Sequence, residues 1–324
     1  MALTAHRGEI LHFVGDPDTD GHQAVEHFAD GMLLIEDGYV VELAPAERVV
    51  PELAQDVHII SHPDGMLIPG LIDTHIHYPQ CEVIGAYGTQ LLDWLETHTF
   101  PAENKFSEFA YAEPVAEFFL DELIRNGTTT ALVFGTVHPE SVDALFEATE
   151  RRNLRMICGK VMMDRNAPEF LTDTPASSYE DSKALINRWH NKGRLSYAVT
   201  PRFAPTSSPE QLQLAAKLMR EYPDVHLHTH LAENDEECNW VAQLFPDSQH
   251  YLDVYDRFEL LGHRSIFAHA IHLSQGEWSR LHQTDSAVAH CPTSNLFIGS
   301  GLFDYQAAQR HNVKVGLGTD VGGG

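Results

Sequence analysis

The feature that most constrains the fold is a regular alternation of short apolar segments and amphipathic segments, which begins after Pro69-Gly70. Apolar segments such as "LIDTHIH" (71–77), "TTTALVF" (128–134) and "SIFAHAIHL" (265–273) are separated by segments with apolar residues at helical spacing. We count roughly eight such strand-helix units, which is the pattern of an α/β protein of the (β/α)8 barrel type. The sequence therefore predicts a TIM-like barrel over 69–324.

The first 68 residues have a different pattern and predict a small β domain. Short strands are expected at 9–14, 32–43, 57–61 and 66–68, and Asp37-Gly38 is a typical two-residue hairpin turn. We interpret 1–68 as part of a composite β-sandwich. The last barrel strand, "KVGLGTD", ends at Asp320, four residues before the end of the sequence. We therefore expect the barrel to be truncated after strand 8, with its C-terminal part missing.

Composition excludes several classes of protein. The formal net charge of -26 argues against nucleic acid as a partner, because nucleic-acid binding depends on Lys and Arg neutralising phosphates. No apolar run is long enough to cross a membrane, and the N-terminus lacks the apolar region of a secretory signal. The four cysteines form no C-x-x-C pair, so no zinc knuckle or disulfide scaffold is indicated. We expect a soluble, cytoplasmic protein.

Chemically active residues recur where the predicted strands end. In barrels of this type, catalytic side chains lie at the carboxyl ends of the strands. In this sequence these ends carry His75, His77, Arg202, Phe203, His230, Glu233, His269 and Asp320. One isolated H-x-H is more often structural than metal-binding, but imidazole at three strand ends and a carboxylate at a fourth fit a catalytic zinc site. Such a site lowers the pKa of a bound water to about 7. Glu233 is then placed to move protons.

The motifs "PGLIDTHIH", "HTHLAEN", "FAHAIHL" and "GLGTD" resemble, in this order, the metal motifs of the amidohydrolase superfamily. Within it, "LLDWLETHTFPAE", "VTPRFAPTSS" and "HCPTSNLFIGSG" are similar to the guanine deaminases, especially the bacterial type. The resemblance runs through essentially the whole chain. It implies a metal-dependent hydrolase acting on a cyclic amidine C–N bond.

The resemblance also implies roles for individual residues. It assigns the zinc to four ligands, which are His75, His77, His230 and Asp320. Asp320 also takes a proton from the attacking water, His269 helps to hold that water, and Glu233 carries protons between water, the purine N3 and the leaving amine. The fourth strand ends in "TPRF" and lacks the lysine typical of two-metal members, so one Zn²⁺ per chain is implied.

Four further residues are assigned to the purine base. Gln80 and Arg202 match groups that hydrogen-bond the guanine edge, with Arg202 at O6, and Phe203 and Trp94 match the aromatic walls. An aromatic residue on an amphipathic helix is as often part of the core, so both interpretations of Trp94 stay open.

The expected reaction is attack of zinc-activated water at C2 of guanine, which gives xanthine and ammonia in purine salvage or catabolism. The partners implied are a small purine base and a second copy of the chain in a homodimer. Two alternatives stay open. One is a sibling amidohydrolase acting on another aminated heterocycle, such as 8-oxoguanine or a triazine, and the other is a non-catalytic fragment of the fold.

Neighbouring residues at the strand ends have less specific interpretations. His226 and His228 share a strand face with His230, and we expect packing roles or support of a ligand for them rather than metal binding. Asp73 is expected to orient its strand end, and Lys160 to be structural or to lie behind the site.

Overall fold

The computed structural model describes residues 3–86 and 91–323. The chain divides into two compact units, Met1–Gly70 and Leu71–Gly324, close to the predicted boundary after residue 68. Each unit is described by itself. None of the helices in the described residues combines the length and the apolar character needed to cross a membrane.

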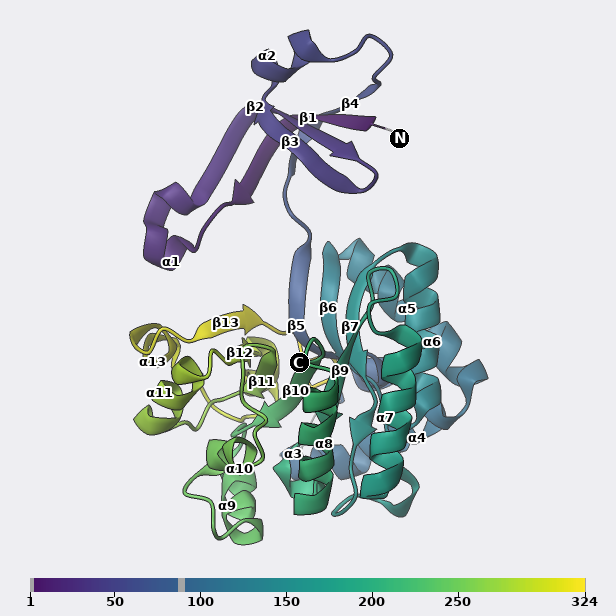
Figure 1. The fold of residues 1–324 in the computed structure, drawn as a ribbon, viewed down its shortest axis with the longest axis vertical. Coiled ribbons are helices and arrows are strands. Elements are labelled where there is room, and N and C mark those ends of the chain that lie inside the picture. Colours follow the sequence, from purple (N-terminus) through teal and green to yellow (C-terminus); the bar gives the residue numbers. More distant parts are fainter. Residues whose placement is uncertain (1–2, 87–90, 324) are drawn as a thin grey trace. The chain divides into compact units, whose positions relative to one another are not determined.

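The first unit is a four-stranded sheet with the strand order β3-β2-β1-β4 (Figure 1). Its strands are β1 (Leu3–Phe13), β2 (Val25–Glu36), β3 (Tyr39–Pro45) and β4 (Ile59–Leu67). Asp37 and Gly38 join β2 to β3 with φ angles of 52° and 83°, as a type I′ hairpin turn requires. The predicted N-terminal β unit is confirmed as a small sheet, and the second sheet of a sandwich stays a prediction.

The second unit is a nearly closed barrel of eight parallel strands, as predicted (Figure 1). In barrel order the strands are β5 (Leu71–His77), β6 (Thr128–Phe134), β7 (Arg155–Gly159), β9 (Ser196–Pro201), β10 (His226–Leu231), β11 (Ser265–His269), β12 (Ala287–His290) and β13 (Lys314–Leu317). The first and last strands meet where Thr74 Oγ1 donates a hydrogen bond to Leu317 O at 2.9 Å.

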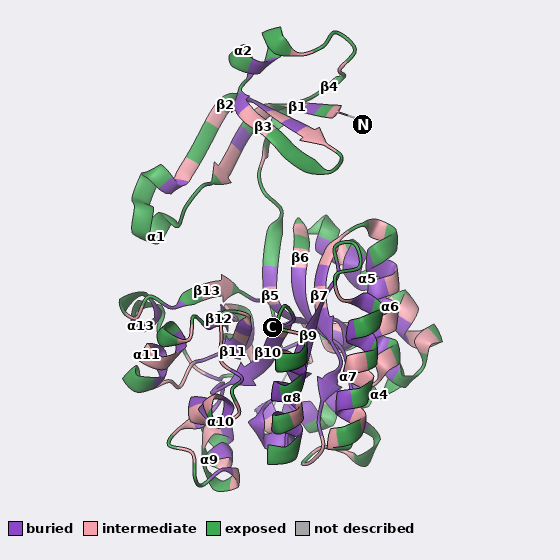
Figure 2. Cartoon of the chain, viewed as in Figure 1, coloured by how far each residue is buried: buried purple, intermediate pink, exposed green. Residues whose placement is uncertain are grey.

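Helices follow the strands on the outside of the barrel (Figure 2). They are α5 (Phe109–Arg125), α6 (Pro139–Arg152), α7 (Pro175–Trp189), α8 (Pro209–Glu221), α9 (Asp235–Leu244), α10 (Tyr251–Arg257), α11 (Gln275–Gln283), α12 (Pro292–Phe297) and α13 (Tyr305–Arg310). Ser208 caps α8, because its side chain accepts from Gln211 N. α7 begins at Pro175, where Thr174 and Ser177 form a capping box.

Residues 91–104 form three short helical pieces and not one regular helix. They are α3 (Leu91–Trp94), a π-helical turn (Leu95–Thr99) and α4 (Phe100–Asn104). Pro101 lies in the first turn of α4, where its missing N–H is tolerated, and it cannot continue a regular α-helix from the preceding turn.

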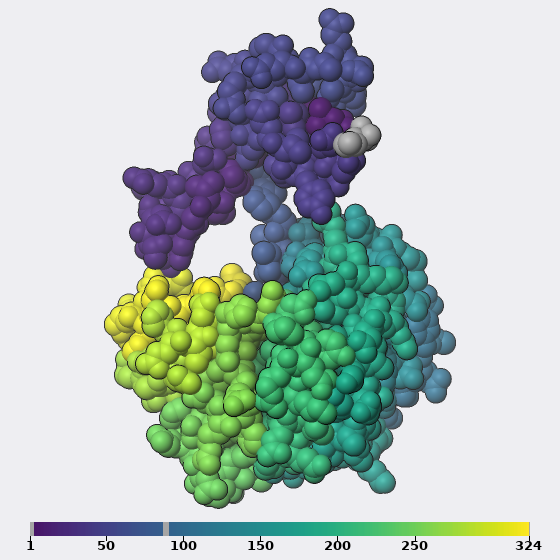
Figure 3. Space-filling view, in the orientation of Figure 1, coloured from purple at the N-terminus to yellow at the C-terminus, as the bar shows by residue number. Residues whose placement is uncertain are grey.

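Apolar side chains fill the space between the barrel strands and the outer helices, where the buried residues concentrate (Figure 2). On the face shown in Figure 3, the helices from the middle of the chain and the last strand-helix units of the barrel form a continuous surface. A second buried cluster, which includes Trp94, Phe100, Phe203 and Ile298, lies at the carboxyl ends of the strands. This cluster supplies the apolar walls of the site described below.

The third barrel strand, β7, ends at Gly159, and after Lys160 the chain forms the short strand β8 (Val161–Met162). Lys160 is fully buried and pairs with Asp173, so it is a structural residue. The chain passes β9 very closely here. A Cβ at Gly159 would lie 1.8 Å from Ala198 O and 2.4 Å from Thr200 Oγ1.

We expect Gly159→Ala to lower the free energy of unfolding by about 3 kcal/mol or more, because the backbone of β9 would have to move. Gly262→Ala is the matched control, since a Cβ there meets nothing within 4 Å, and it should change stability by less than about 0.5 kcal/mol. Urea unfolding of both variants measures the difference. Equal stability of the two would show that β7 and β9 are not packed this closely.

Candidate active site

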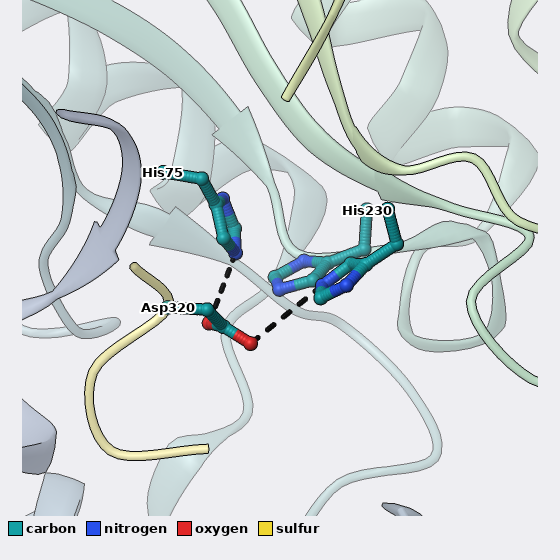
Figure 4. Close-up of side chains that lie close together, drawn as sticks. His75, His230 and Asp320 are labelled. Atoms are coloured by element: carbon teal, nitrogen blue, oxygen red, sulfur yellow. Dashed lines mark ion pairs between the residues drawn. The ribbon is translucent and has the colours of Figure 1, made fainter. Parts of the chain in front are cut away.

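Five side chains from four strand ends meet at one end of the barrel. His75 and His77 come from β5, His230 from β10, His269 from β11, and Asp320 follows β13. Nε2 of His75 and Nε2 of His77 lie 3.1 and 3.2 Å from Asp320 Oδ1 and 3.2 Å from each other. Figure 4 shows His75 pointing toward the carboxylate of Asp320.

This geometry fits a metal ion. Ligand atoms of His75, His230, His269 and Asp320 all lie within 4.8 Å of one another. Tetrahedral zinc with ligands at about 2.0–2.1 Å places those ligands roughly 3.3 Å apart, which is close to the separations among His75, His77 and Asp320. This group of four, which we call the compact group, contains His269, whereas the predicted ligand set contains His77. Nε2 of His77 and Nε2 of His269 both lie near the Asp320 carboxylate, at 3.2 and 3.8 Å.

The outward-facing ring nitrogens fix the orientation of the imidazoles. His230 Nδ1 donates to Arg202 O at 2.7 Å, so its Nε2 keeps a free lone pair. His75 Nδ1 lies 2.8 Å from His228 Nε2, and His269 Nδ1 lies 2.9 Å from Asn295 Oδ1. Partners of this kind orient metal-binding histidines and raise their basicity.

Burial favours the neutral form of three of the imidazoles, those of His75, His77 and His230. It lowers the pKa of His77 to about 3 and the pKa values of His75 and His230 below their usual value. Neutral imidazole is the form that binds metal. Burial alone would raise the pKa of Asp320, but His75 and His77 hold it well below its usual range. The site thus offers an ionised carboxylate among neutral imidazoles.

Glu233 lies beside this group. Its Oε2 lies 3.4 Å from His269 Nε2, and its Oε1 accepts from Ser300 Oγ at 3.4 Å. Its backbone N–H donates to Glu237 Oε2 at 2.9 Å. Burial raises the pKa of Glu233 well above its usual value, and repulsion from Asp320 and Glu237 adds to this. Glu233 can therefore carry a proton at neutral pH.

A pocket opens onto these groups. It is lined by His77, Gln80, Leu91, Trp94, Leu95, Arg202, Phe203, His230, Glu233, Ile298, Asp320 and Gly323. All the predicted site residues except His75 and His269 therefore line it. Trp94 donates its indole N–H to Ala86 O at 2.8 Å and belongs to the buried cluster as well as to the pocket wall.

Four further residues, which the sequence motifs did not predict, hold these groups in place. Glu103, Asn295, Ser300 and Glu237 contact Arg202, His269 or Glu233 but are assigned no role above. Glu103 reads as an exposed residue of an amphipathic helix, and only the fold brings it to Arg202. Asn295 had a signal, since it lies in the motif "HCPTSNLFIGSG". Asp73 ties the end of β5 to Thr319 and so orients its strand end.

Residues 66–324 match the model of the amidohydrolase family. The chain belongs to this family. It is 54% identical to the guanine deaminase of Escherichia coli (strain K12) over 99% of this chain and 74% of that relative. A solved structure of E. coli guanine deaminase superposes with a TM-score of 0.97 at 52% identity, covering 99% of this chain and 75% of the other. Guanine deaminase from C. acetobutylicum with bound guanine in the active site gives a TM-score of 0.91 at 30% identity, with 99% and 75% coverage.

Glu233→Gln should stabilise the metal-free chain, more strongly at pH 7.5 than at pH 5. The folded chain keeps a proton on Glu233 that the unfolded chain releases above the usual pKa of 4.5, so stability is lost as the pH rises toward the raised pKa. The amide removes this loss, and we expect a gain on the order of 1 kcal/mol at pH 7.5.

Urea unfolding in the presence of a chelator, at both pH values, measures the gain. Glu236→Gln is the control, because Glu236 lies three residues further along and is exposed. A gain that is the same at the two pH values, or that Glu236→Gln reproduces, would contradict the raised pKa.

Proposed function

We propose that this chain is a guanine deaminase that converts guanine and water to xanthine and ammonia. The observation that carries the proposal is the position of Arg202 and Glu233 in one pocket with the His/Asp group. The close similarity to guanine deaminases, at more than half of all positions in one case, supports the same substrate.

We assign one zinc ion to His75, His77, His230 and Asp320. When bound, the metal supplies a water nucleophile at neutral pH and stabilises developing negative charge. The ring separations and the neutral imidazoles described above support this assignment, as does the donor set of three imidazoles and a carboxylate. His269 then lies beside the ligands and directs Nε2 toward Glu233 and Asp320.

The protein's own groups position the base and move the protons. Arg202 donates to O6 of guanine, and Phe203 and Trp94 pack against its faces. Asp320, kept ionised by its neighbours, accepts a proton from the attacking water. Glu233 delivers its proton to N3 as C2 becomes tetrahedral, then takes the proton of the new C2 hydroxyl group and passes it to the departing amine, so that ammonia leaves. The proton held by Asp320 then returns to Glu233 for the next turnover. His269 holds the attacking water on the C2 side.

We extend the proposal to the wider setting that the sequence resemblance implies. In this setting the chain acts as a homodimer in the cytoplasm, in purine salvage or catabolism. The substrate is a free base, and the formal charge of -26 disfavours polyphosphate ligands.

The zinc-loaded chain should convert guanine to xanthine, followed by ultraviolet absorbance. Glu233→Gln should lower kcat by about a thousandfold while zinc stays bound, because an amide cannot transfer the protons. Glu236→Gln should retain wild-type activity. Lack of guanine turnover by the zinc-loaded wild type would overturn the proposed function.

The two alternative ligand sets predict different zinc affinities. We expect His77→Asn to weaken zinc binding by more than the roughly 10–100-fold typical of residues that only support a ligand, and His269→Asn to stay within that range. Competition with a chromogenic chelator measures both. If His269→Asn weakened zinc binding more than His77→Asn did, the zinc would be assigned to the compact group, which contains His269.

A further inference from the structure

Glu103 is a buried carboxylate with no part in the mechanism above. Its side chain is only 1% exposed and comes from α4. Both of its oxygens contact Arg202 Nη1, at 2.9 and 2.8 Å, and Oε1 also accepts from Gln80 Nε2 at 3.2 Å. One carboxylate therefore joins the two side chains to which recognition of the guanine edge is assigned.

A carboxylate can only accept hydrogen bonds, so the neighbours of Glu103 must direct donor atoms toward it. Their remaining polar atoms then face the pocket. Gln80 must direct Nε2 toward Glu103, which leaves Oε1 as the acceptor on the other side. There, among the described residues, it accepts a long hydrogen bond from Gly322 N, at 3.4 Å. Arg202 contacts Glu103 through Nη1, so within the described residues its Nε and Nη2 remain available as donors.

Gln80 and Arg202 both line the pocket, which therefore presents an acceptor next to donors. This pattern complements the edge of guanine on which the C6 carbonyl lies beside N1–H. A purine with an amino group at C6 has the reverse pattern, since its C6 substituent donates and its N1 accepts. Both hydrogen bonds would then be lost, and buried polar groups left unpaired discriminate strongly between substrates.

Glu103 also balances the charge of Arg202. The two side chains are 1% and 3% exposed, and a buried charge without a partner would be strongly destabilising. With the pair intact, this side of the pocket has no net charge from these two groups. It is therefore suited to a neutral carbonyl rather than to an anionic ligand.

We propose that Glu103 is a positioning residue that sets the hydrogen-bond polarity of the recognition edge and so selects 6-oxo purines over 6-amino purines. The inference rests on the proposed function. It assigns selectivity to a side chain that acts through Gln80 and Arg202, and Glu103 itself makes no contact with the base.

The test compares kcat/KM for guanine with kcat/KM for 2,6-diaminopurine, which keeps the reacting 2-amino group and changes only the C6/N1 edge. A partly misfolded preparation lowers both values equally, so their ratio reports recognition alone. Glu103→Gln should lower the ratio at least tenfold, because an amide also donates and no longer fixes the direction of Gln80. Glu103→Asp keeps the carboxylate and should retain more of the ratio than Glu103→Gln.

Glu82→Gln is the matched control, since Glu82 forms an exposed ion pair with Lys105 nearby and does not line the pocket. It should leave the ratio unchanged. If the wild type deaminates guanine but Glu103→Gln keeps the wild-type ratio, the inference alone is overturned. If the wild type does not act on guanine, the proposed function fails and the inference falls with it.

Should the Glu103→Gln chain not fold, Gln80→Met tests the same edge, because it removes the Oε1 acceptor for N1–H together with the Nε2 donor to Glu103. The ratio must then fall. A wild-type ratio in Gln80→Met would overturn the assignment of Gln80 Oε1 as that acceptor, and with it the role of Glu103.

Discussion

The junction between the first barrel strand and the segment after the last one is the contact on which the site depends. Asp73 accepts both the N–H and the hydroxyl of Thr319, at 3.2 and 2.6 Å, and Asp320 N donates to His75 O at 2.9 Å. His77 N in turn donates to Val321 O at 3.0 Å. These bonds bring Asp320 beside the two histidines of β5, although most of the barrel separates them in the sequence. The carboxylate can therefore meet the imidazoles only when the barrel is formed.

Different neighbours favour opposite protonation states for two buried carboxyl groups in the same site. Asp320 lies against His75 and His77, and its contacts with their ring nitrogens hold its pKa well below its usual range. Glu233 lies close to Asp320 and Glu237, and their repulsion adds to the effect of burial in favouring its protonated form. A pair of carboxyl groups whose pKa values are moved apart in this way divides the work between a base and an acid. The division follows from which neighbours each group has, since both are almost fully buried.

The sequence was sufficient for the barrel and for the groups at its strand ends, because strand-helix alternation and residues such as His75 and Asp320 are local signals. Features that depend on contacts distant in sequence were not predictable from the residues. The break at Lys160 follows from the approach of Gly159 to β9, and the role of Glu103 follows from the path of α4 over the end of the fourth barrel strand. The choice between His77 and His269 as a ligand depends on distances of a few ångströms, which no spacing in the sequence encodes.

Backbone conformation at the strand ends links the chemistry to the stability of the barrel. Ala232, His269 and Asp320 have φ angles of 48°, 71° and 53°, in the left-handed region that costs non-glycine residues about 1–3 kcal/mol each. Bonds between strands offset this cost, such as the one from Ala270 N to Leu231 O at 2.8 Å. The closed barrel therefore holds His269 and Asp320 in conformations that an isolated strand end would leave. The unfolded chain does not hold these ligands together, so a metal binds only the folded site. Its binding free energy therefore adds to the stability of the same barrel.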